Sequence, residues 1–289
     1  MDFKDLSIPP VLYHYTSWDT FEKIVKNVQT IVNNGDYEKF LRFGKNFRNY
    51  SFNNLVLIFA QFPEATIVAG KSKWLKMKRE LITGAQKIFI IAPIPRQYQK
   101  KVKVIENDEE IEKTEVIKYN NYRYVYVYDI SQTVGEELPL QIQNNNGNDM
   151  GYFYEKLKSF SKVPVIEENL FGTLQGYYSE KEQKIAIRKD LSLNDKTSTL
   201  LHELAHCLYD DFDYGKDKNL SEIFVESIAY IVANYFGLDT SMCSFNYITK
   251  YANGDPKMVI DLGTKIQKHA NQFIDNLEKF EMQELELAA

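Results

Sequence analysis

The feature that most constrains the fold of this chain is the run His-Glu-Leu-Ala-His at residues 202–206, inside the apolar stretch "LLHELAHCLYDD". Two histidines four residues apart lie on one face of an α-helix, one turn from each other, and can chelate a single ion. We therefore predict a long helix over residues 196–211, capped by Asn194 or Asp195. The stretch "TLQGYYSEKEQKIAIR" before it predicts a β-hairpin.

The residue types in this run are those of a zinc site. Neutral imidazole nitrogens suit Zn²⁺ in tetrahedral geometry, and a catalytic zinc keeps one position open for water beside three protein ligands. Glu203 follows the first histidine and is then the general base that takes a proton from that water. The pattern predicts a zinc-dependent metallopeptidase in which His202 and His206 bind the metal. Mn²⁺ or another divalent cation is the alternative to zinc.

Two acids in "SEIFVESIAY" offer a third ligand, because Glu222 and Glu226 also lie four residues apart on a predicted helix. Their place after the motif resembles the gluzincin layout, in which a helix-borne Glu completes the metal site and an acid one turn later supports a ligating histidine. On that resemblance Glu222 is the third ligand, and Glu226 is the partner that fixes a histidine tautomer. The reverse assignment stays open.

Plainer interpretations of these residues also stay open. The two histidines can be core residues without a metal, or the metal can stabilise the fold without catalysis. Cys207 points about 100° around the helix from His206 and is expected to pack rather than to bind metal. A group that stabilises the oxyanion is also expected. The sequence does not choose among four candidates, Tyr177, Tyr178, Tyr209 and Tyr230.

Hydrophobic spacing predicts an α+β first half. Helical spacing is found in "WDTFEKIVKNVQTIVNN" and again around Phe40 and Phe43, and Ser51 could cap a third helix that stops before Pro63. A short strand and a basic helix with Trp74 follow. Then come a buried strand, "QKIFIIAPI", an acidic loop at 106–115 and a returning strand, "YRYVYVYDISQT".

The second half is predicted to be mainly helical. Residues 134–151 are rich in Asn, Gln and Gly and are expected to form a linker. Beyond the metal-site helix and its hairpin, helices are expected in "GYFYEKLKSFSK", in "LSEIFVESIAYIVANYFG", which Gly237 ends, and over 256–285.

Charge is unevenly distributed along the chain. Residues 36–105 carry 14 Lys and Arg against 4 Asp and Glu, a net charge of +10, whereas residues 151–289 carry 15 against 22, a net charge of −7. Aromatic residues lie among the cations of the basic window. Cations neutralise phosphates and unstacked bases lie on exposed rings, so this combination favours single-stranded nucleic acid over a duplex, which hides its base faces.

This basic segment resembles a known family, the N-terminal domain of the ArdC-type antirestriction proteins. The residues that carry the resemblance are Tyr50-Ser51-Phe52-Asn53-Asn54, Gln61-Phe62-Pro63-Glu64-Ala65-Thr66, Trp74, Ala92-Pro93, Asp129, Ser131, Gln132 and Thr133. The resemblance covers about residues 36–240 and keeps the family's domain order, because a zincin-like domain with His-Glu-x-x-His follows in both.

The resemblance implies a single-stranded DNA-binding domain fused to a metallopeptidase-like domain. Such proteins belong to conjugative plasmids and related mobile elements, where they protect incoming DNA from restriction. We predict an α+β fold with two domains: a DNA-binding domain over 1–133 with lead-in helices in 1–35, a linker over 134–151, and a mainly helical zincin-like domain with a small antiparallel sheet over 152–289. The expected DNA contacts are Lys45, Arg48, Tyr50, Asn53, Trp74, Lys76, Lys78 and Arg79.

The remaining expectations concern location and partners. The sequence has no apolar run of about 18 residues and no signal-peptide pattern at its N-terminus. Cys207 and Cys243 do not make a disulfide framework, so we expect a cytoplasmic protein without a membrane partner. The expected partners are single-stranded DNA and a host protein that the peptidase cleaves. Two alternatives stay open: a DNA-coating antirestriction protein with a structural zinc, and a cytoplasmic regulatory metalloprotease whose front domain binds protein.

Overall fold

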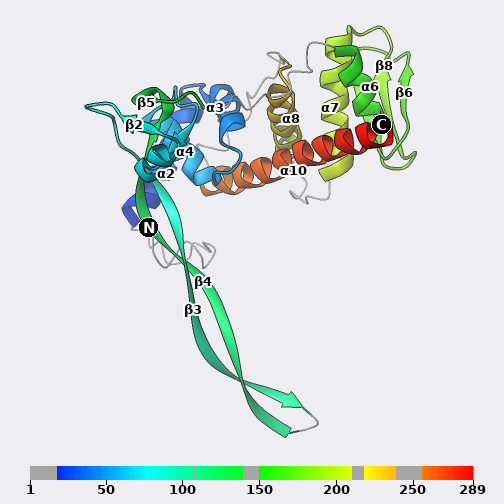
Figure 1. Ribbon diagram of the computed structural model, residues 1–289. Coiled ribbons are helices and arrows are strands. Elements are labelled where there is room, and N and C mark those ends of the chain that lie inside the picture. Colours follow the sequence, from blue (N-terminus) through cyan, green and yellow to red (C-terminus); the bar gives the residue numbers. More distant parts are fainter. Residues whose placement is uncertain (1–17, 107–108, 139–149, 210–217, 239–255, 289) are drawn as a thin grey trace. The chain divides into compact units, whose positions relative to one another are not determined.

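Figure 1 shows the fold in a computed structural model, which describes residues 18–106, 109–138, 150–209, 218–238 and 256–288. The fold is mixed α and β, as predicted, and the chain divides into two compact units. Unit 1 comprises Met1–Lys26 and Ile67–Glu136, and unit 2 comprises Asn27–Thr66 and Glu137–Ala289. Residues 27–66 therefore group with the C-terminal half, although the sequence assigned them to the front. The functional boundaries at 133 and 152 stay a prediction.

Unit 1 contains two small antiparallel sheets. The helix α2 (Trp18–Asn33) begins in this unit. One sheet has the order β1-β4-β3, with β1 (Val68–Ala69), β3 (Ile88–Glu106) and β4 (Glu109–Asp129). The other pairs β2 (Arg79–Leu81) with β5 (Thr133–Gly135). The helix α5 (Lys71–Lys76) and the 3-10 turn η3 (Ile130–Gln132) complete the unit.

The basic helix predicted around Trp74 is shorter than expected. It ends at Lys76, because Lys78 adopts a positive φ of 56° and the chain continues into β2 at Arg79. The first residues of the predicted linker belong to β5, which pairs with β2. Gly135 has a φ of 144°, and a Cβ there would collide with the Lys78 backbone, so this close pairing requires glycine.

The two longest strands form one β-hairpin, a twisted ribbon that extends away from the rest of unit 1 (Figure 1). β3 and β4 pair from Ile88 opposite Val127 to Glu106 opposite Glu109. The acidic loop predicted over 106–115 is therefore wrong, because residues 109–115 belong to β4. Glu115 lies opposite Lys100, and opposite charges directly across an antiparallel pair stabilise it, so an acidic run can extend the strand.

The base of the hairpin is anchored by buried residues. Trp74 is fully buried and donates its Nε1–H to the carbonyl oxygen of Tyr128 at 2.9 Å. Asp129 is also buried, and its carboxylate accepts hydrogen bonds from the backbone N–H groups of Ile67 and Ser131. Residues that carry the family resemblance thus connect β1, α5 and β4 at the base of the ribbon.

Unit 2 is mainly helical with one small sheet. Its front helices are α3 (Tyr37–Gly44), the 3-10 turn η2 (Lys45–Phe47) and α4 (Phe52–Gln61). Its other helices are α6 (Met150–Phe160), α7 (Leu193–Tyr209), α8 (Lys218–Tyr235) and α10 (Pro256–Ala288). Its strands are β6 (Val165–Glu168), β7 (Gly176–Ser179) and β8 (Lys184–Arg188). Among the helices that the structure describes, none has the length and apolar run that a bilayer crossing requires.

The hairpin predicted before the metal-site helix is confirmed. β7 and β8 pair antiparallel, with Tyr178 opposite Ile185. β6, which the sequence did not predict, pairs with β8 in parallel, so the sheet is mixed and has the order β6-β8-β7. The central strand β8 buries Ile185, Ala186 and Ile187, as expected for a strand with neighbours on both edges.

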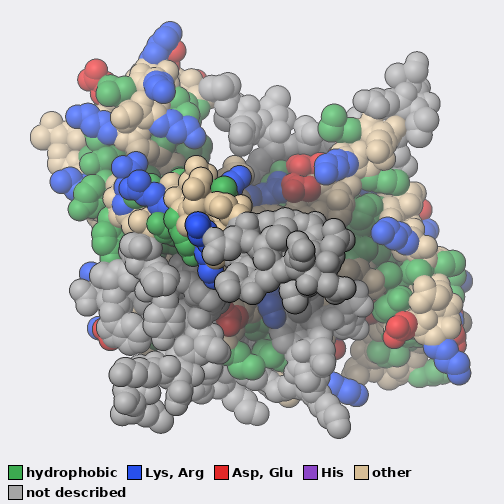
Figure 2. Space-filling view, turned by 90° about the horizontal axis from the view of Figure 1, so that it is seen from below, with side chains coloured by type: hydrophobic (Ala, Val, Ile, Leu, Met, Phe, Trp, Pro, Cys, Tyr) green, Lys and Arg blue, Asp and Glu red, His purple; other side chains and the backbone are tan. Residues whose placement is uncertain are grey.

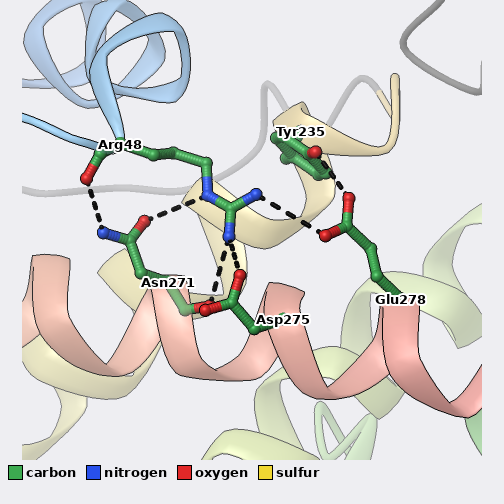
Figure 3. Close-up of polar contacts among 5 residues, drawn as sticks. All are labelled: Arg48, Tyr235, Asn271, Asp275 and Glu278. Atoms are coloured by element: carbon green, nitrogen blue, oxygen red, sulfur yellow. Dashed lines mark hydrogen bonds and ion pairs between the residues drawn. The ribbon is translucent and has the colours of Figure 1, made fainter.

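The helix α10 connects the front of unit 2 to its centre. Arg48 donates from Nε to Asn271 Oδ1 at 3.3 Å, bonds the Asp275 carboxylate, and lies 3.8 Å from Glu278 (Figure 3). Its guanidinium also lies over the ring of Tyr235, 4.7 Å from the centroid. The planar guanidinium binds carboxylates and stacks on an aromatic ring at the same time, and lysine is a poor substitute in this role.

Candidate metal centre

The helix that carries the histidines is capped at its N-terminus by the side chain of Ser192. Ser192 accepts a hydrogen bond from the Asp195 backbone N–H at 3.2 Å and donates its hydroxyl to the Asp195 carboxylate at 2.7 Å. The cap is therefore Ser192, and the predicted caps Asn194 and Asp195 lie inside the helix. The helix continues to Tyr209, so both histidines lie in regular α-helix.

The three predicted metal ligands lie together. The Nε2 atoms of His202 and His206 are 3.2 Å apart. Glu222 on α8 brings one carboxylate oxygen to 3.4 Å from His202 Nε2 and the other to 3.6 Å from His206 Nε2. Within the described residues, these three side chains form a group that could hold a metal ion.

The spacing of these atoms fits a divalent cation. Bonds of about 2.0–2.1 Å at a tetrahedral angle place two ligand atoms about 3.3 Å apart. The two imidazole nitrogens are 3.2 Å apart, and each has a different Glu222 oxygen near it, at 3.4 Å and 3.6 Å, so each of these neighbouring pairs agrees with that value. Proximity to the two imidazoles lowers the pKa of Glu222 well below its usual range, so this carboxyl group holds the charge that a cation requires. Two imidazoles and one carboxylate suit Zn²⁺ and other divalent transition metals.

Glu203 is positioned beside this group but does not belong to it. Its side chain is 7% exposed, and burial raises its pKa, against the opposing effect of the two histidines and a hydrogen bond with the Tyr178 backbone. A buried carboxylate with a raised pKa is a better proton acceptor than an exposed one. Glu203 therefore has the environment of a general base.

Other polar candidates lie elsewhere. The pKa of Tyr37 on α3 is raised mainly by burial and further by the nearby charge of Glu226. Glu226 therefore lies near α3, and it is not part of the metal group. Cys207 is half-buried and hydrogen-bonds with the Tyr178 side chain. The hydroxyl of Tyr230 donates to Glu38 at 2.9 Å, which directs it toward α3.

Gly176 allows the sheet to approach the metal-site helix. A Cβ at this position would meet Thr199 Cγ2 at 2.6 Å and the Ala186 carbonyl oxygen at 2.9 Å. Thr199 lies on α7 one turn before the first histidine. The close contact sets the distance between β7 and α7, and through it the position of the Tyr178 backbone relative to Glu203.

Several predicted DNA contacts have internal roles instead. Trp74 is 0% exposed, which corrects the expectation that a base stacks on it. The Arg48 guanidinium is bound by α10 and flanked by two carboxylates that would repel a phosphate, which corrects its assignment as a DNA contact. Arg79 donates to Thr133 Oγ1 at 2.8 Å and to the Thr133 carbonyl oxygen at 3.1 Å, so it joins β2 to β5.

The remaining predicted contacts stay predictions. Lys76 and Lys78 are exposed in unit 1, and Lys78 pairs with Glu136 at 2.7 Å. Lys45, Tyr50 and Asn53 are partly exposed in unit 2. On the face drawn in Figure 2, Lys and Arg side chains are interspersed with hydrophobic ones rather than merged into one cationic patch.

The most exposed aromatic side chains of unit 1 are not among the predicted DNA contacts. They lie on the hairpin and are Tyr98, Tyr119, Tyr124 and Tyr126, with exposed fractions of 50%, 37%, 48% and 55%. The signal for Tyr124 and Tyr126 is the alternation "YRYVYVY", which places tyrosines on one face of a strand. It was interpreted only as a pairing strand.

Comparison with known proteins identifies the front of the chain. Residues 18–128 match the family described as the N-terminal domain of anti-restriction factor ArdC. This segment is similar to the ArdC N-terminal domain. The match runs from α2 into β4, and it confirms the resemblance read from the sequence.

The ArdC-like architecture extends over most of the chain. The metal-free crystal structure of the antirestriction ArdC protein from the R388 plasmid superimposes with a TM-score of 0.55 and 14% identity, covering 91% of this chain and 99% of that one. The Mn(II)-bound structure of the R388 ArdC protein gives 0.51 and 15%, covering 80% and 88%. At these identities the likeness shows a shared fold.

One relative in Bacillus anthracis is similar at the sequence level. It is the uncharacterized protein pXO2-81, which is 24% identical over 302 residues, or 90% of this chain and 51% of the relative. The chain therefore spans about half the length of this relative.

Proposed function

We propose that the chain is an antirestriction protein of a mobile element, with a front that binds single-stranded DNA and a zinc-dependent metallopeptidase site on α7 and α8. The observation that carries the peptidase part is the convergence of His202, His206 and Glu222 beside the buried Glu203. The ArdC N-terminal domain and the shared fold support the antirestriction part. The cytoplasm, where incoming DNA meets restriction enzymes, is the proposed location.

The metal site has a defined division of roles in this proposal. His202 and His206 would hold the cation through Nε2, and Glu222 through a carboxylate oxygen. The bound cation, Zn²⁺ or Mn²⁺, would polarise a carbonyl group and lower the pKa of a water molecule. Glu203 accepts the proton of the attacking water and returns it to the leaving amine. The Mn(II)-bound R388 ArdC structure supports a divalent cation here.

A catalytic site is favoured over a structural one by the ligand count and by Glu203. Structural zinc sites are closed by four protein ligands, whereas three ligands leave a position for water. The group on α7 and α8 offers three among the described residues. A purely structural zinc also gives no reason to bury a carboxyl group against the sheet at this position.

The substitution Glu203→Gln tests the proposal. It keeps the shape of the side chain and removes the base, so affinity for Zn²⁺ and Mn²⁺, measured by calorimetry, should stay within a few-fold of the original. Cleavage of a proteome-derived peptide library should be lost, and so should protection of conjugating DNA in a restriction-proficient host. Full protection by the Glu203→Gln variant would support DNA coating with a structural zinc instead.

A further inference from the structure

The register of the β3–β4 hairpin divides its side chains between two faces. Directly paired residues share a face, and so do alternate residues along a strand. Tyr126 opposite Phe89, Tyr124 opposite Ile91, and Tyr122 opposite Pro93 therefore lie on one face. We call this the tyrosine face. It continues toward the end of the ribbon with Pro95, Gln97, Gln99, Lys101, Thr114, Val116, Lys118 and Asn120.

The rings of the tyrosine face are exposed although they belong to regular strands. Tyr124 is 48% exposed and Tyr126 is 55% exposed. Tyrosine rings in sheets normally contribute by burial against a second layer. Here Phe89 contacts Tyr124 edge to face at 6.0 Å, and this contact leaves about half of the Tyr124 surface accessible.

The charge of the tyrosine face suits a polyanion. Among the described side chains from 87 to 101 and from 114 to 126, this face carries Lys87, Lys101 and Lys118 and no acid. Lys87 lies over the Tyr126 ring, 5.3 Å from its centroid. The opposite face carries the cations Arg96, Lys100 and Arg123 together with an acid, Glu115. Its two exposed rings, Tyr98 and Tyr119, pack edge to face with each other at 5.8 Å.

The spacing of the rings selects an extended single strand. Alternate residues of an antiparallel strand are about 6.8 Å apart. Successive bases in duplex DNA are separated by about 3.4 Å and have both faces covered by their neighbours. Two bases can stack on neighbouring rings of the tyrosine face only when they are separated from each other, as in an extended single strand.

We propose that the tyrosine face is a stacking surface for single-stranded DNA, in which bases lie on Tyr124 and Tyr126 while Lys87 and Lys118 meet the phosphates. This inference rests on the proposed DNA binding and names the surface that performs it. It assigns to the hairpin the stacking role that the buried Trp74 cannot have.

Binding of the full chain to a labelled oligothymidylate, measured by fluorescence anisotropy against a duplex of equal length, tests the proposal. The double substitution Tyr124→Ala and Tyr126→Ala should weaken single-strand binding by roughly tenfold or more. Changing both residues to Phe should keep most of the affinity, because stacking needs the ring and not the hydroxyl. Lys118→Gln should flatten the salt dependence of the logarithm of affinity by about 0.7.

The matched control is Tyr98→Ala with Tyr119→Ala, which removes two exposed tyrosines from the opposite face of the same hairpin. It should change affinity less than twofold, and circular dichroism should show that both double variants fold. Equal losses for the two faces, or no loss for Tyr124 and Tyr126, would overturn the inference while single-strand binding itself stands. If the unsubstituted chain bound neither DNA at moderate salt, the proposed DNA binding would be wrong, and the inference with it.

Discussion

The metal centre of unit 2 and the hairpin of unit 1 position their side chains in opposite ways. In the metal centre, two packed helices bring one ligand atom from each of three side chains within 4.8 Å of one another. In the hairpin, the side chains of residues 95–101 and 114–120 are mostly exposed on both faces, and each of these strand segments has the other as its only pairing partner among the described residues.

The difference teaches which chemistry each region can support. A metal site needs ligands held within fractions of an ångström, which requires helices fixed by packing on several sides. Stacking of a flexible single strand tolerates looser geometry, because every base offers a planar face and the spacing repeats along the strand. Rigid convergence therefore suits the proposed catalysis, and regular repetition suits the proposed DNA surface.

Removal of a metal ligand should have the largest effect. Glu222→Ala takes away one of three convergent ligands, so affinity for Zn²⁺ or Mn²⁺ should fall by about 100-fold or more, as measured by calorimetry. Glu226→Ala is the matched control on the same helix and should cost less than tenfold, because its charge lies toward Tyr37. A larger loss for Glu226→Ala than for Glu222→Ala would reverse the ligand assignment.

The second-largest effect should come from a substitution at the contact between the sheet and the metal-site helix. Gly176→Ala forces a methyl group against Thr199 and the Ala186 carbonyl, so the free energy of unfolding should fall by about 1–3 kcal/mol in urea denaturation. Gly44→Ala is the control, because a Cβ there meets only a Leu55 methyl group at 3.7 Å. Equal stabilities of the two variants would show that β7 and α7 are not tightly packed.

A substitution of Arg48 distinguishes a role inside the protein from a role in DNA binding. Arg48→Lys keeps the charge but loses the bonds to Asn271 and the stacking on Tyr235, so stability should fall by about 1 kcal/mol. Affinity for single-stranded DNA should stay unchanged, in contrast with Lys118→Gln on the hairpin. A Lys variant with native stability and weakened DNA binding would restore Arg48 to the list of contacts.

The smallest expected effect is a pH dependence from an ion pair between the sheet and α7. Lys196 bonds Glu167 at 2.7 Å and lowers the pKa of its carboxyl group below the usual value of 4.5. Because the folded-state pKa is lowered, this stabilisation is present above about pH 4.5 and is lost as pH falls through the folded-state value. Glu167→Gln should therefore flatten the acid side of the stability profile slightly, as measured by urea midpoints. An unchanged acid slope would mean that solvent screens the pair completely.

Local patterns predicted the elements of the metal centre but not their arrangement. The i and i+4 spacing of the histidines, and of Glu222 with Glu226, is fixed by helix geometry and could be read from the sequence. The choice of Glu222 could not be derived from spacing, since it depends on how α8 packs on α7. The parallel strand β6 was missed because its four residues carry no alternation between buried and exposed positions.

The DNA contacts were harder to predict for a similar reason. A tryptophan among lysines has the same local pattern whether it faces solvent or the core, and packing against β4 decides that Trp74 is buried. The acidic run at 109–115 was predicted to be part of a loop, and nothing within that segment shows which residues its acids would pair with. Its partner, the lysine-rich end of β3, becomes visible only when the two strands are placed in register.

The division of unit 2 into residues 27–66 and 137–289 has a consequence for synthesis on the ribosome. Tyr37 bonds Ser227 across 190 positions, and Arg48 reaches Asp275 across 227. The apolar faces of α3 and α4 therefore emerge long before α8 and α10 exist to cover them. Contacts between residues so far apart in the sequence form late, which slows folding and leaves hydrophobic surface exposed on the nascent chain. We expect chaperone dependence during translation, and early release before α10 should give an aggregating fragment.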